Sequence, residues 1–274
     1  MLLLTEIGGL GSAAEFQSAL TAGLTGWLGL GPEAVRVTVA GALPTLDLLE
    51  VDVSGGRVDP DQLSLSTPEG IRQGRWGLSV RRFEFRAQPL WWAEEAQIHL
   101  LAQGQGAQLH AFTDANQDHW LMVSGAAGGT AVLEMKEDQL ENLVLATLRR
   151  AAGKLGLSIK DGAVELVQSG KHSLGMRVKA AVGRGFLRGK CEVSGQLLLN
   201  DHLDMQLRGL TCSSHGAVGS VVVSLLKPLV ARWEGTKFSL LGPLLANLQC
   251  DSVKLNVGQR GQLRVEAGLR EQLA

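Results

Sequence analysis

The chain has 274 residues, of which 45% are hydrophobic, and its formal net charge at pH 7 is −1. This composition supplies ample apolar material for a sizeable core, so we expect the chain to fold. Because the charges nearly cancel, no overall field attracts nucleic acid, and we expect no nucleic-acid partner.

The first predicted element is an amphipathic helix over residues 12–28. Ser12 is followed three residues later by Glu15, which is the spacing of a capping box at a helix amino terminus. Behind this cap, apolar side chains recur at helical intervals at Phe16, Leu20, Leu24 and Trp27. The pattern predicts a helix with one buried face.

Alternation of apolar and polar residues then predicts many strands. In the amino-terminal half, these strands fall near residues 35–39, 49–53, 78–85, 97–101, 107–112 and 120–124. From Ser173 onward the alternation resumes over residues 174–182, 191–193 and 203–207. Turn residues such as Asn200 and Asp201 separate neighbouring strands there, so those strands must run antiparallel. We therefore expect an extensive antiparallel sheet.

A second helix is predicted over residues 136–154, with acidic residues in its first turn and basic residues in its last, as the helix dipole favours. Its apolar stripe consists of Leu140, Leu143, Val144, Leu148 and Ala151.

A third helix is predicted around residues 221–233. Its apolar positions Val222, Leu225, Leu226, Leu229, Val230 and Trp233 have helical spacing. Because Pro228 disfavours a helix interior, an alternative remains open in which residues 218–226 form a strand. The apolar core of this segment is only about ten residues long, against about 20 needed to cross a bilayer, and Lys227 interrupts it. We do not expect it to span a membrane.

These elements predict an α+β fold with an extensive antiparallel sheet and three amphipathic helices. We expect one domain over residues 1–274. The segments GWLGLGPEAVRVTVAG and GKLGLSIKDGAVELVQSG resemble each other, so a weak internal duplication with halves 12–125 and 136–268 stays open. The alternative is that helix-to-strand junctions commonly look alike.

The cysteines and the first residues of the chain indicate in which cellular compartment the protein is located. Cys191, Cys212 and Cys250 are odd in number and widely spaced, which suits a reducing compartment better than a disulfide framework. The start, MLLLTEIGG, lacks the basic region of a signal peptide. We expect a cytoplasmic protein, with peripheral membrane attachment or prior removal of a targeting segment as open alternatives.

The sequence contains parts of a dinucleotide-binding motif, a calcium loop and a zinc site, and each of these motifs is incomplete. Residues 9–14 match a dinucleotide-binding G-x-G-x-x-A, yet no acidic residue closes the next strand to bind a ribose. Residues 114–118 begin like a calcium loop, but a hairpin loop explains them better. Cys212, His215 and Cys250 lack the paired spacing of a zinc site. We predict no catalytic residue, no metal and no cofactor. A hydrolase whose catalytic residues do not match a known motif remains an open hypothesis.

Two features remain that could serve binding. The helices and strands carry a surplus of apolar faces, together with Trp91 and Trp92, and such surfaces must be covered by each other or by a ligand. Basic residues gather in two stretches, residues 72–86 and 171–190, and the second contains no acidic residue. A solvated strand face explains these cations without function. Alternatively, if the two stretches meet in space, their cations would attract anionic lipid headgroups.

Several stretches resemble the LmeA-like family, a domain of unknown function. These are LDLLEVDVSGGRVDPDQLSLS, GLSVRRFEFRAQPL, MKEDQLENLV, SLGMRVKAAV, KCEVSGQLLLNDHLDMQLRGL, LLKPLV and LQCDSVKLNVGQRGQLRVEAG. The resemblance covers most of the chain, through spacing and alternation more than through invariant residues. It implies a fold related to tubular lipid-binding proteins, in which a strongly twisted antiparallel sheet wraps around amphipathic helices and encloses an apolar groove. It also implies phospholipid binding without a catalytic motif.

We therefore expect a non-enzymatic protein that binds a phospholipid or another long apolar ligand in a groove between sheet and helices. The expected groove residues are Val222, Leu225, Leu226, Leu229 and Trp233. The expected membrane or partner surface consists of Trp91, Trp92, Arg177, Lys179, Arg188 and Lys190. The alternative is a protein–protein interaction or scaffold module with a fully packed core.

Overall fold

The computed structural model describes residues 2–4, 11–59, 76–92, 96–115, 119–154, 156–184, 187–200, 204–214, 217–239, 249–257 and 262–270. Within these residues a ten-stranded sheet contains β1 (Leu2–Leu4), β2 (Arg36–Ala42), β3 (Thr45–Asp52), β4 (Arg57–Val58), β5 (Trp76–Trp92), β6 (Ala96–Thr113), β7 (His119–Gly125), β8 (Gly128–Lys136), β14 (Gln249–Val257) and β15 (Gln262–Arg270). A five-stranded sheet contains β9 (Ser158–Gly170), β10 (Ser173–Arg184), β11 (Leu187–Leu199), β12 (Asp204–Ser214) and β13 (Lys237–Ser239).

The helices follow the sequence pattern closely. Helix α1 covers Ala13–Leu28, α2 covers Glu137–Gly153, α3 covers Ala217–Trp233, and a short 3-10 helix, η1, covers Pro32–Ala34. Ser12 caps α1, and both bonds of the predicted capping box with Glu15 are present. Helix α3 continues through Pro228, so the alternative that began this segment with a strand is wrong.

The α+β class with a large, mostly antiparallel sheet is confirmed. The first sheet has the order β14-β15-β8-β6-β5-β3-β2, and the second has the order β13-β12-β11-β10-β9. The expectation of a wholly antiparallel sheet is wrong at one place, because β3 and β4 both pair with β5 in parallel. Residues 53–75 separate β3 from β5, which is long enough for the chain to return to the same end of the sheet.

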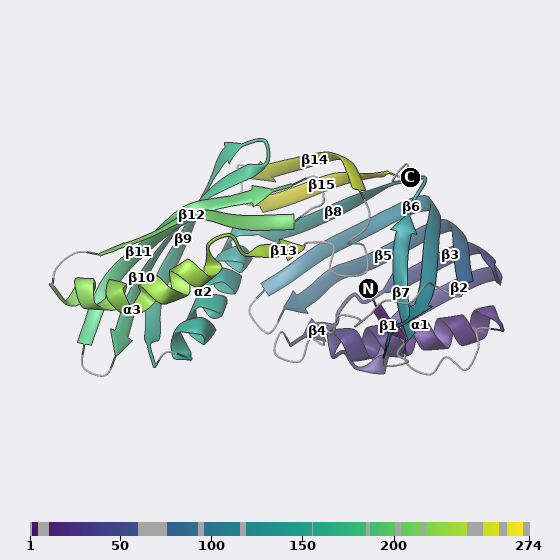
Figure 1. The fold of residues 1–274 in the computed structure, drawn as a ribbon, viewed down its shortest axis with the longest axis horizontal. Coiled ribbons are helices and arrows are strands. Elements are labelled where there is room, and N and C mark those ends of the chain that lie inside the picture. The colour runs from purple at the N-terminus through teal and green to yellow at the C-terminus, as the bar shows by residue number, and fades with distance from the viewer. Residues whose placement is uncertain are drawn as a thin grey trace.

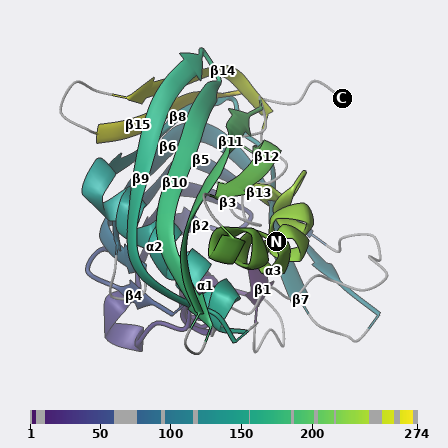
Figure 2. The same ribbon diagram turned by 90° about the vertical axis from the view of Figure 1, so that its left-hand side faces the viewer.

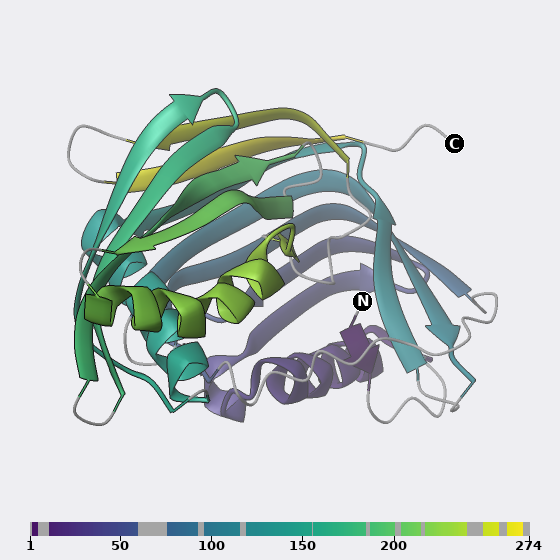
Figure 3. The ribbon, with the colours of Figure 1, turned by 60° about the vertical axis from the view of Figure 1, so that its left-hand side comes forward.

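The two sheets lie next to each other along the long axis of the molecule and curve in the same sense, with the helices on their concave side (Figures 1 and 3). Figure 2 shows β9 and β10 running together down one end, with the first sheet behind them. Helix α1 packs on the first sheet next to β2, while α2 packs against β9 and α3 against β11 and β12. The Gln168 side chain of β9 donates to the Leu255 carbonyl of β14 at 3.0 Å, which joins an edge of one sheet to an edge of the other.

Each of the two sheets has buried apolar clusters of its own, and the largest cluster also joins the two sheets. The largest cluster contains the buried face of α1, including Phe16, Leu20 and Leu24, and most apolar residues of the first sheet. It also includes Leu174 and Leu199 from the second sheet. Two smaller clusters lie between the second sheet and helices α2 and α3. The hydrophobic effect therefore binds the two sheets to each other as well as to their helices.

The two similar segments noted in the sequence form the same local structure. Gly29 after α1 and Gly156 after α2 both have a positive φ, 63° and 71°. The next residue in each case is buried, and its N–H donates five residues back into the helix: Leu30 to Thr25 at 3.1 Å and Leu157 to Ala152 at 3.0 Å. This is the hydrogen bond of a Schellman cap, which a glycine in the left-handed region allows. The chain then enters an edge strand in both places, β2 after the short helix η1 and β9 directly after Leu157.

Replacing Gly29 by alanine should lower the free energy of unfolding by about 1 kcal/mol, because the left-handed backbone costs an L-residue about 1–2 kcal/mol. The matched control is Gly26→Ala inside α1, where an added Cβ meets nothing within 4 Å. Because alanine favours the helix interior, the control should raise stability by about 0.5–1 kcal/mol. Urea unfolding followed by circular dichroism measures both. A stabilising effect of Gly29→Ala would contradict this account of the cap.

Candidate functional site

The sequence predicts that α3 lines a ligand groove, but three of its described apolar side chains pack as core. Val223, Leu226 and Val230 are 9%, 4% and 8% exposed. Leu226 packs in a cluster with residues of α2, β10 and β11, and Val230 packs in the neighbouring cluster. Trp233 is half-buried at the edge of that second cluster. The side chains of Val222, Leu225 and Leu229 lie outside the described residues.

Trp91 and Trp92 end strand β5, and both are half-buried. The guanidinium of Arg57 in β4 lies 5.6 Å from the centre of the Trp91 ring, a cation–π contact. Trp92 packs against the main core cluster. Trp91 therefore connects the end of β5 to β4, and Trp92 connects it to the core.

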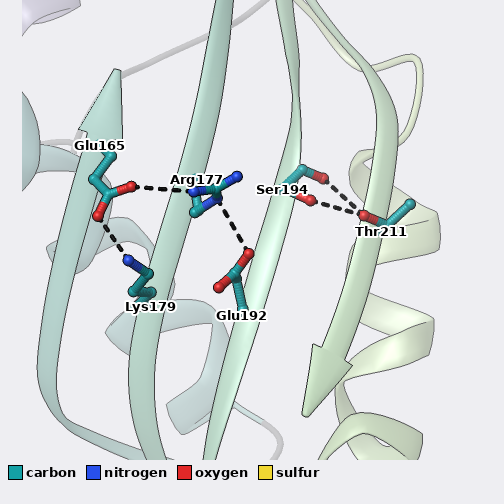
Figure 4. A network of polar contacts seen from close by, with 6 residues as sticks. All are labelled: Glu165, Arg177, Lys179, Glu192, Ser194 and Thr211. Atoms are coloured by element: carbon teal, nitrogen blue, oxygen red, sulfur yellow. Dashed lines mark hydrogen bonds and ion pairs between the residues drawn. The ribbon is translucent and has the colours of Figure 1, made fainter. Parts of the chain in front are cut away.

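Two of the predicted basic residues have acidic partners that the sequence order conceals. Arg177 lies opposite Glu165 of β9, and Lys179 lies opposite Glu192 of β11. The Arg177 guanidinium contacts Glu165 at 3.5 Å and Glu192 at 3.2 Å, while Lys179 Nζ contacts Glu165 at 2.7 Å (Figure 4). The Lys179 ammonium, and then Arg177, hold the pKa of Glu165 below its usual value. This face of the sheet is a network of both signs.

The other two predicted cations, Arg188 and Lys190, lie near the start of β11 and are exposed. Their opposite residues on β10 are Gly183 and Ala181, which carry no charge. Among the described residues, neither cation has an ion pair. Arg188 and Lys190 are therefore the predicted cations that remain available to an anionic surface.

A pocket with a volume of about 510 Å³ lies at the other end of the second sheet. It is lined by the β9–β10 turn at residues 172–173, the end of β11 at residues 198–200, and Gln206 and Arg208 of β12. The strand register places Ser173, Leu198 and Gln206 opposite one another, so their side chains form one row across three strands. The Leu199 N–H donates to the His172 carbonyl at 2.8 Å and closes the end of the row.

Polar contacts hold the wall of the pocket that β12 provides. Arg208 Nε donates to Gln206 Oε1 at 2.9 Å, and Gln206 Nε2 donates to the Gly235 carbonyl at 3.1 Å. Sequence reasoning missed every residue of this pocket. In the chain, Gln206 and Arg208 are ordinary polar residues of an alternating strand, and only the pairing of three strand ends makes them neighbours.

Two incomplete motifs have structural roles. Strand β1 pairs with β7 and β2 pairs with β3, both antiparallel, so the parallel β-α-β unit of a dinucleotide site around α1 is contradicted. The predicted hairpin between β6 and β7 is confirmed. At its base, Trp120 Nε1 donates to the Asp114 carboxylate at 3.1 Å, and Asp114 is 1% exposed.

The cysteines belong to separate parts of the core. Cys250 lies in the main cluster, whereas Cys191 and Cys212 lie under the second sheet. Burial, with a smaller effect from Cys212, raises the pKa of Cys191 to about 11. Burial also raises the pKa of Cys212, although the Lys227 ammonium opposes this shift. Over the part of the chain that the structure describes, no group of three or more His, Cys, Asp or Glu side chains is arranged to hold a metal ion.

The raised pKa of Cys191 predicts a loss of stability at alkaline pH. Between the ordinary value of 9.0 and about 11, the unfolded thiol has released its proton while the folded thiol retains it. The stabilisation is therefore complete below pH 9 and is lost as pH rises toward 11, by about 1–2 kcal/mol. The measurement is the difference in unfolding free energy between pH 8 and pH 11, which should be smaller in Cys191→Ala than in the wild type. Equal pH dependence in both proteins would disprove the shift.

No helix within the described ranges combines the length and apolar character needed to cross a membrane. Comparison with known proteins finds no matching family model, no similar curated protein and no similar solved structure.

Proposed function

We propose that the protein binds a phospholipid or another long apolar molecule without carrying out a reaction on it. The supporting observation is the pocket of about 510 Å³ at the end of the second sheet. One of its walls is Leu199, which is also a member of the main core cluster. An apolar chain entering beside Leu198 and Leu199 therefore meets the rim of the core.

The size and energetics of the pocket suit this role. Small-molecule sites commonly have volumes of about 300–1,000 Å³. Each buried methylene contributes about 0.8 kcal/mol, so about ten buried methylenes offset an association cost of the usual order. Leu197 and Met205, partly buried beside the core cluster, continue the apolar surface behind Leu199.

The proposed entry point differs from the α3 groove expected from the sequence, because Val223, Leu226 and Val230 are already covered by the second sheet and α2. The resemblance to the LmeA-like family, and through it to tubular lipid-binding proteins, adds support of a separate kind. The resemblance depends on the pattern of helices and alternating strands in the sequence, whereas the pocket is a feature of how these elements pack in three dimensions.

The proposal is tested by filling the pocket. Native mass spectrometry of the purified protein incubated with dioleoylglycerol should show a bound lipid, and Leu198→Trp should weaken binding at least about tenfold, because the indole occupies the apolar wall. The matched control is Val167→Trp, an equivalent change at a β9 side chain that is 66% exposed. Unchanged lipid binding by Leu198→Trp would overturn this site. No lipid binding by the wild type would favour the interaction module with a packed core.

Docking on an anionic membrane is a second part of the proposal and depends on Arg188 and Lys190. Each cation near such a surface contributes about 1 kcal/mol, so the double substitution Arg188→Gln/Lys190→Gln should weaken binding to phosphatidylserine vesicles about tenfold or more. The control with the same charge change is Arg177→Gln/Lys179→Gln, whose cations are paired with Glu165 and Glu192. Flotation assays at low salt measure both. Equal loss in the two double variants would show that net charge alone drives binding.

A further inference from the structure

The polar side chains that line the pocket share one chemical property, which is the ability to donate a hydrogen bond. His172, Ser173, Asn200, Gln206 and Arg208 can all donate hydrogen bonds, and none of the described residues that line the pocket carries a carboxylate. Arg208 supplies a full positive charge. The remaining lining residues, Leu198 and Leu199, are apolar. A pocket with many donors, one fixed cation and an apolar wall matches a ligand with an anionic end and an apolar remainder.

Arg208 is held in an orientation suited to an anion. Its bond to Gln206 uses Nε, and Gln206 is fixed in turn by the Gly235 carbonyl, so the plane of the guanidinium is set by β12 itself. The two terminal nitrogens are the part of the guanidinium that binds two oxygens of one phosphate or carboxylate at once. No ion pair occupies Arg208 among the described residues.

One carboxylate near this site, among the described residues, already has hydrogen-bond partners. Glu234, which follows α3, accepts hydrogen bonds from the backbone N–H groups of Gly209 and Leu210 at 2.9 and 2.8 Å. These are the two residues after Arg208. The Glu234 carboxylate therefore stabilises the bend of β12 at Gly209, where φ is 63°, and is not paired with the Arg208 side chain.

At the β9–β10 turn, the pocket contains two polar groups that can each make a further hydrogen bond. The Ser173 hydroxyl accepts from the Ser169 hydroxyl at 3.0 Å, so its own proton can be donated to a ligand. The Nδ1 atom of His172 is buried and has no hydrogen-bond partner. A buried polar atom without a partner costs about 1–3 kcal/mol, which a small rotation of the ring toward a bound anion would recover.

We propose that this pocket is a subsite for the phosphate group of an organic phosphate, and that in the apolar ligand proposed above it selects lipids with a phosphate-bearing head. This inference rests on the proposed function for the lipid, while the anion site itself can be tested alone. Phosphate fits better than carboxylate because the donors come from three sides, the turn, the end of β11 and β12, and phosphate offers oxygens in several directions.

The test compares two lipids with the same tails and different heads, dioleoyl phosphatidic acid and dioleoylglycerol. The wild type should bind phosphatidic acid at least about tenfold more tightly, which corresponds to one charge-assisted contact. Arg208→Gln should remove this preference, because it should weaken binding of phosphatidic acid about tenfold more than binding of dioleoylglycerol. The matched control is Arg36→Gln, which removes an exposed arginine from β2 in the other sheet and should keep the preference.

The outcomes separate the two proposals. Equal affinity of the wild type for both lipids, or an equal loss in Arg208→Gln and Arg36→Gln, would overturn the phosphate subsite while leaving lipid binding in place. A separate titration with glycerol 3-phosphate covers the case in which neither lipid binds. Binding that Arg208→Gln abolishes would then uphold an anion site for a free organic phosphate and overturn the lipid proposal, and no binding would overturn both.

Discussion

Replacing Leu226 by alanine should lower the free energy of unfolding by about 3 kcal/mol. Leu226 is 4% exposed and packs with Val223, Ala152 of α2 and Cys191 of β11. Truncation removes buried methyl groups and leaves a cavity that neighbours on three elements cannot easily fill, and such changes cost about 2–5 kcal/mol. Lipid binding measured on the folded variant should stay within about twofold of the wild type, because the proposed pocket lies at the far end of the sheet.

Val221→Ala is the matched control for this prediction. Val221 lies on the same helix and is 48% exposed, so its truncation should change stability by less than about 0.5 kcal/mol. The decisive comparison is between chemical denaturation and lipid binding. If Leu226→Ala weakened lipid binding strongly and left stability almost unchanged, α3 would line the ligand site as the sequence indicated, and the packing described above would not be its main role.

The second large effect is expected at Phe16, whose replacement by alanine should lower the free energy of unfolding by about 4 kcal/mol. Phe16 is fully buried on α1 and belongs to the main core cluster. Loss of a buried phenyl ring costs about 3–5 kcal/mol. Because the same cluster includes Leu174 and Leu199, we expect the second sheet to lose stability together with the first.

Phe16→Leu is the control, since it keeps an apolar side chain of similar size and should cost less than about 1.5 kcal/mol. Unfolding of Phe16→Ala should be followed both by circular dichroism and by hydrogen exchange at β10 and β11. A variant in which the first sheet is destabilised and exchange in β10 and β11 is unchanged would show that the shared core does not couple the two sheets.

The four charged residues of Figure 4 show why candidate surfaces are hard to judge from sequence. Arg177 and Lys179 lie in a stretch of β10 without acidic residues, which made them look like an exposed basic cluster. Their partners, Glu165 and Glu192, lie 12 or more positions away and become neighbours only through the pairing of β9, β10 and β11. A one-residue change of register would have left both cations without these partners.

The sequence by itself determined the local structure of this protein. The capping box at Ser12, the helical spacing of apolar residues in all three helices and the two Leu-Gly-Leu junctions depend on contacts within a few residues, so they are visible in the order of the chain. Period-two alternation likewise identified many of the strands, including β2, β3, β5 and β10, because side chains of a strand point to opposite faces whatever strand lies beside it.

Only the tertiary structure decided which strands share a sheet, that β3 and β5 run in parallel, and that α3 turns Leu226 toward the second sheet. It also decided the pocket, where Ser173, Leu198 and Gln206 meet across three strands. These features depend on hydrogen bonds and apolar contacts between residues far apart in the chain. Alternation along one strand contains no information about its partner or its register, and the packing of the whole core selects both.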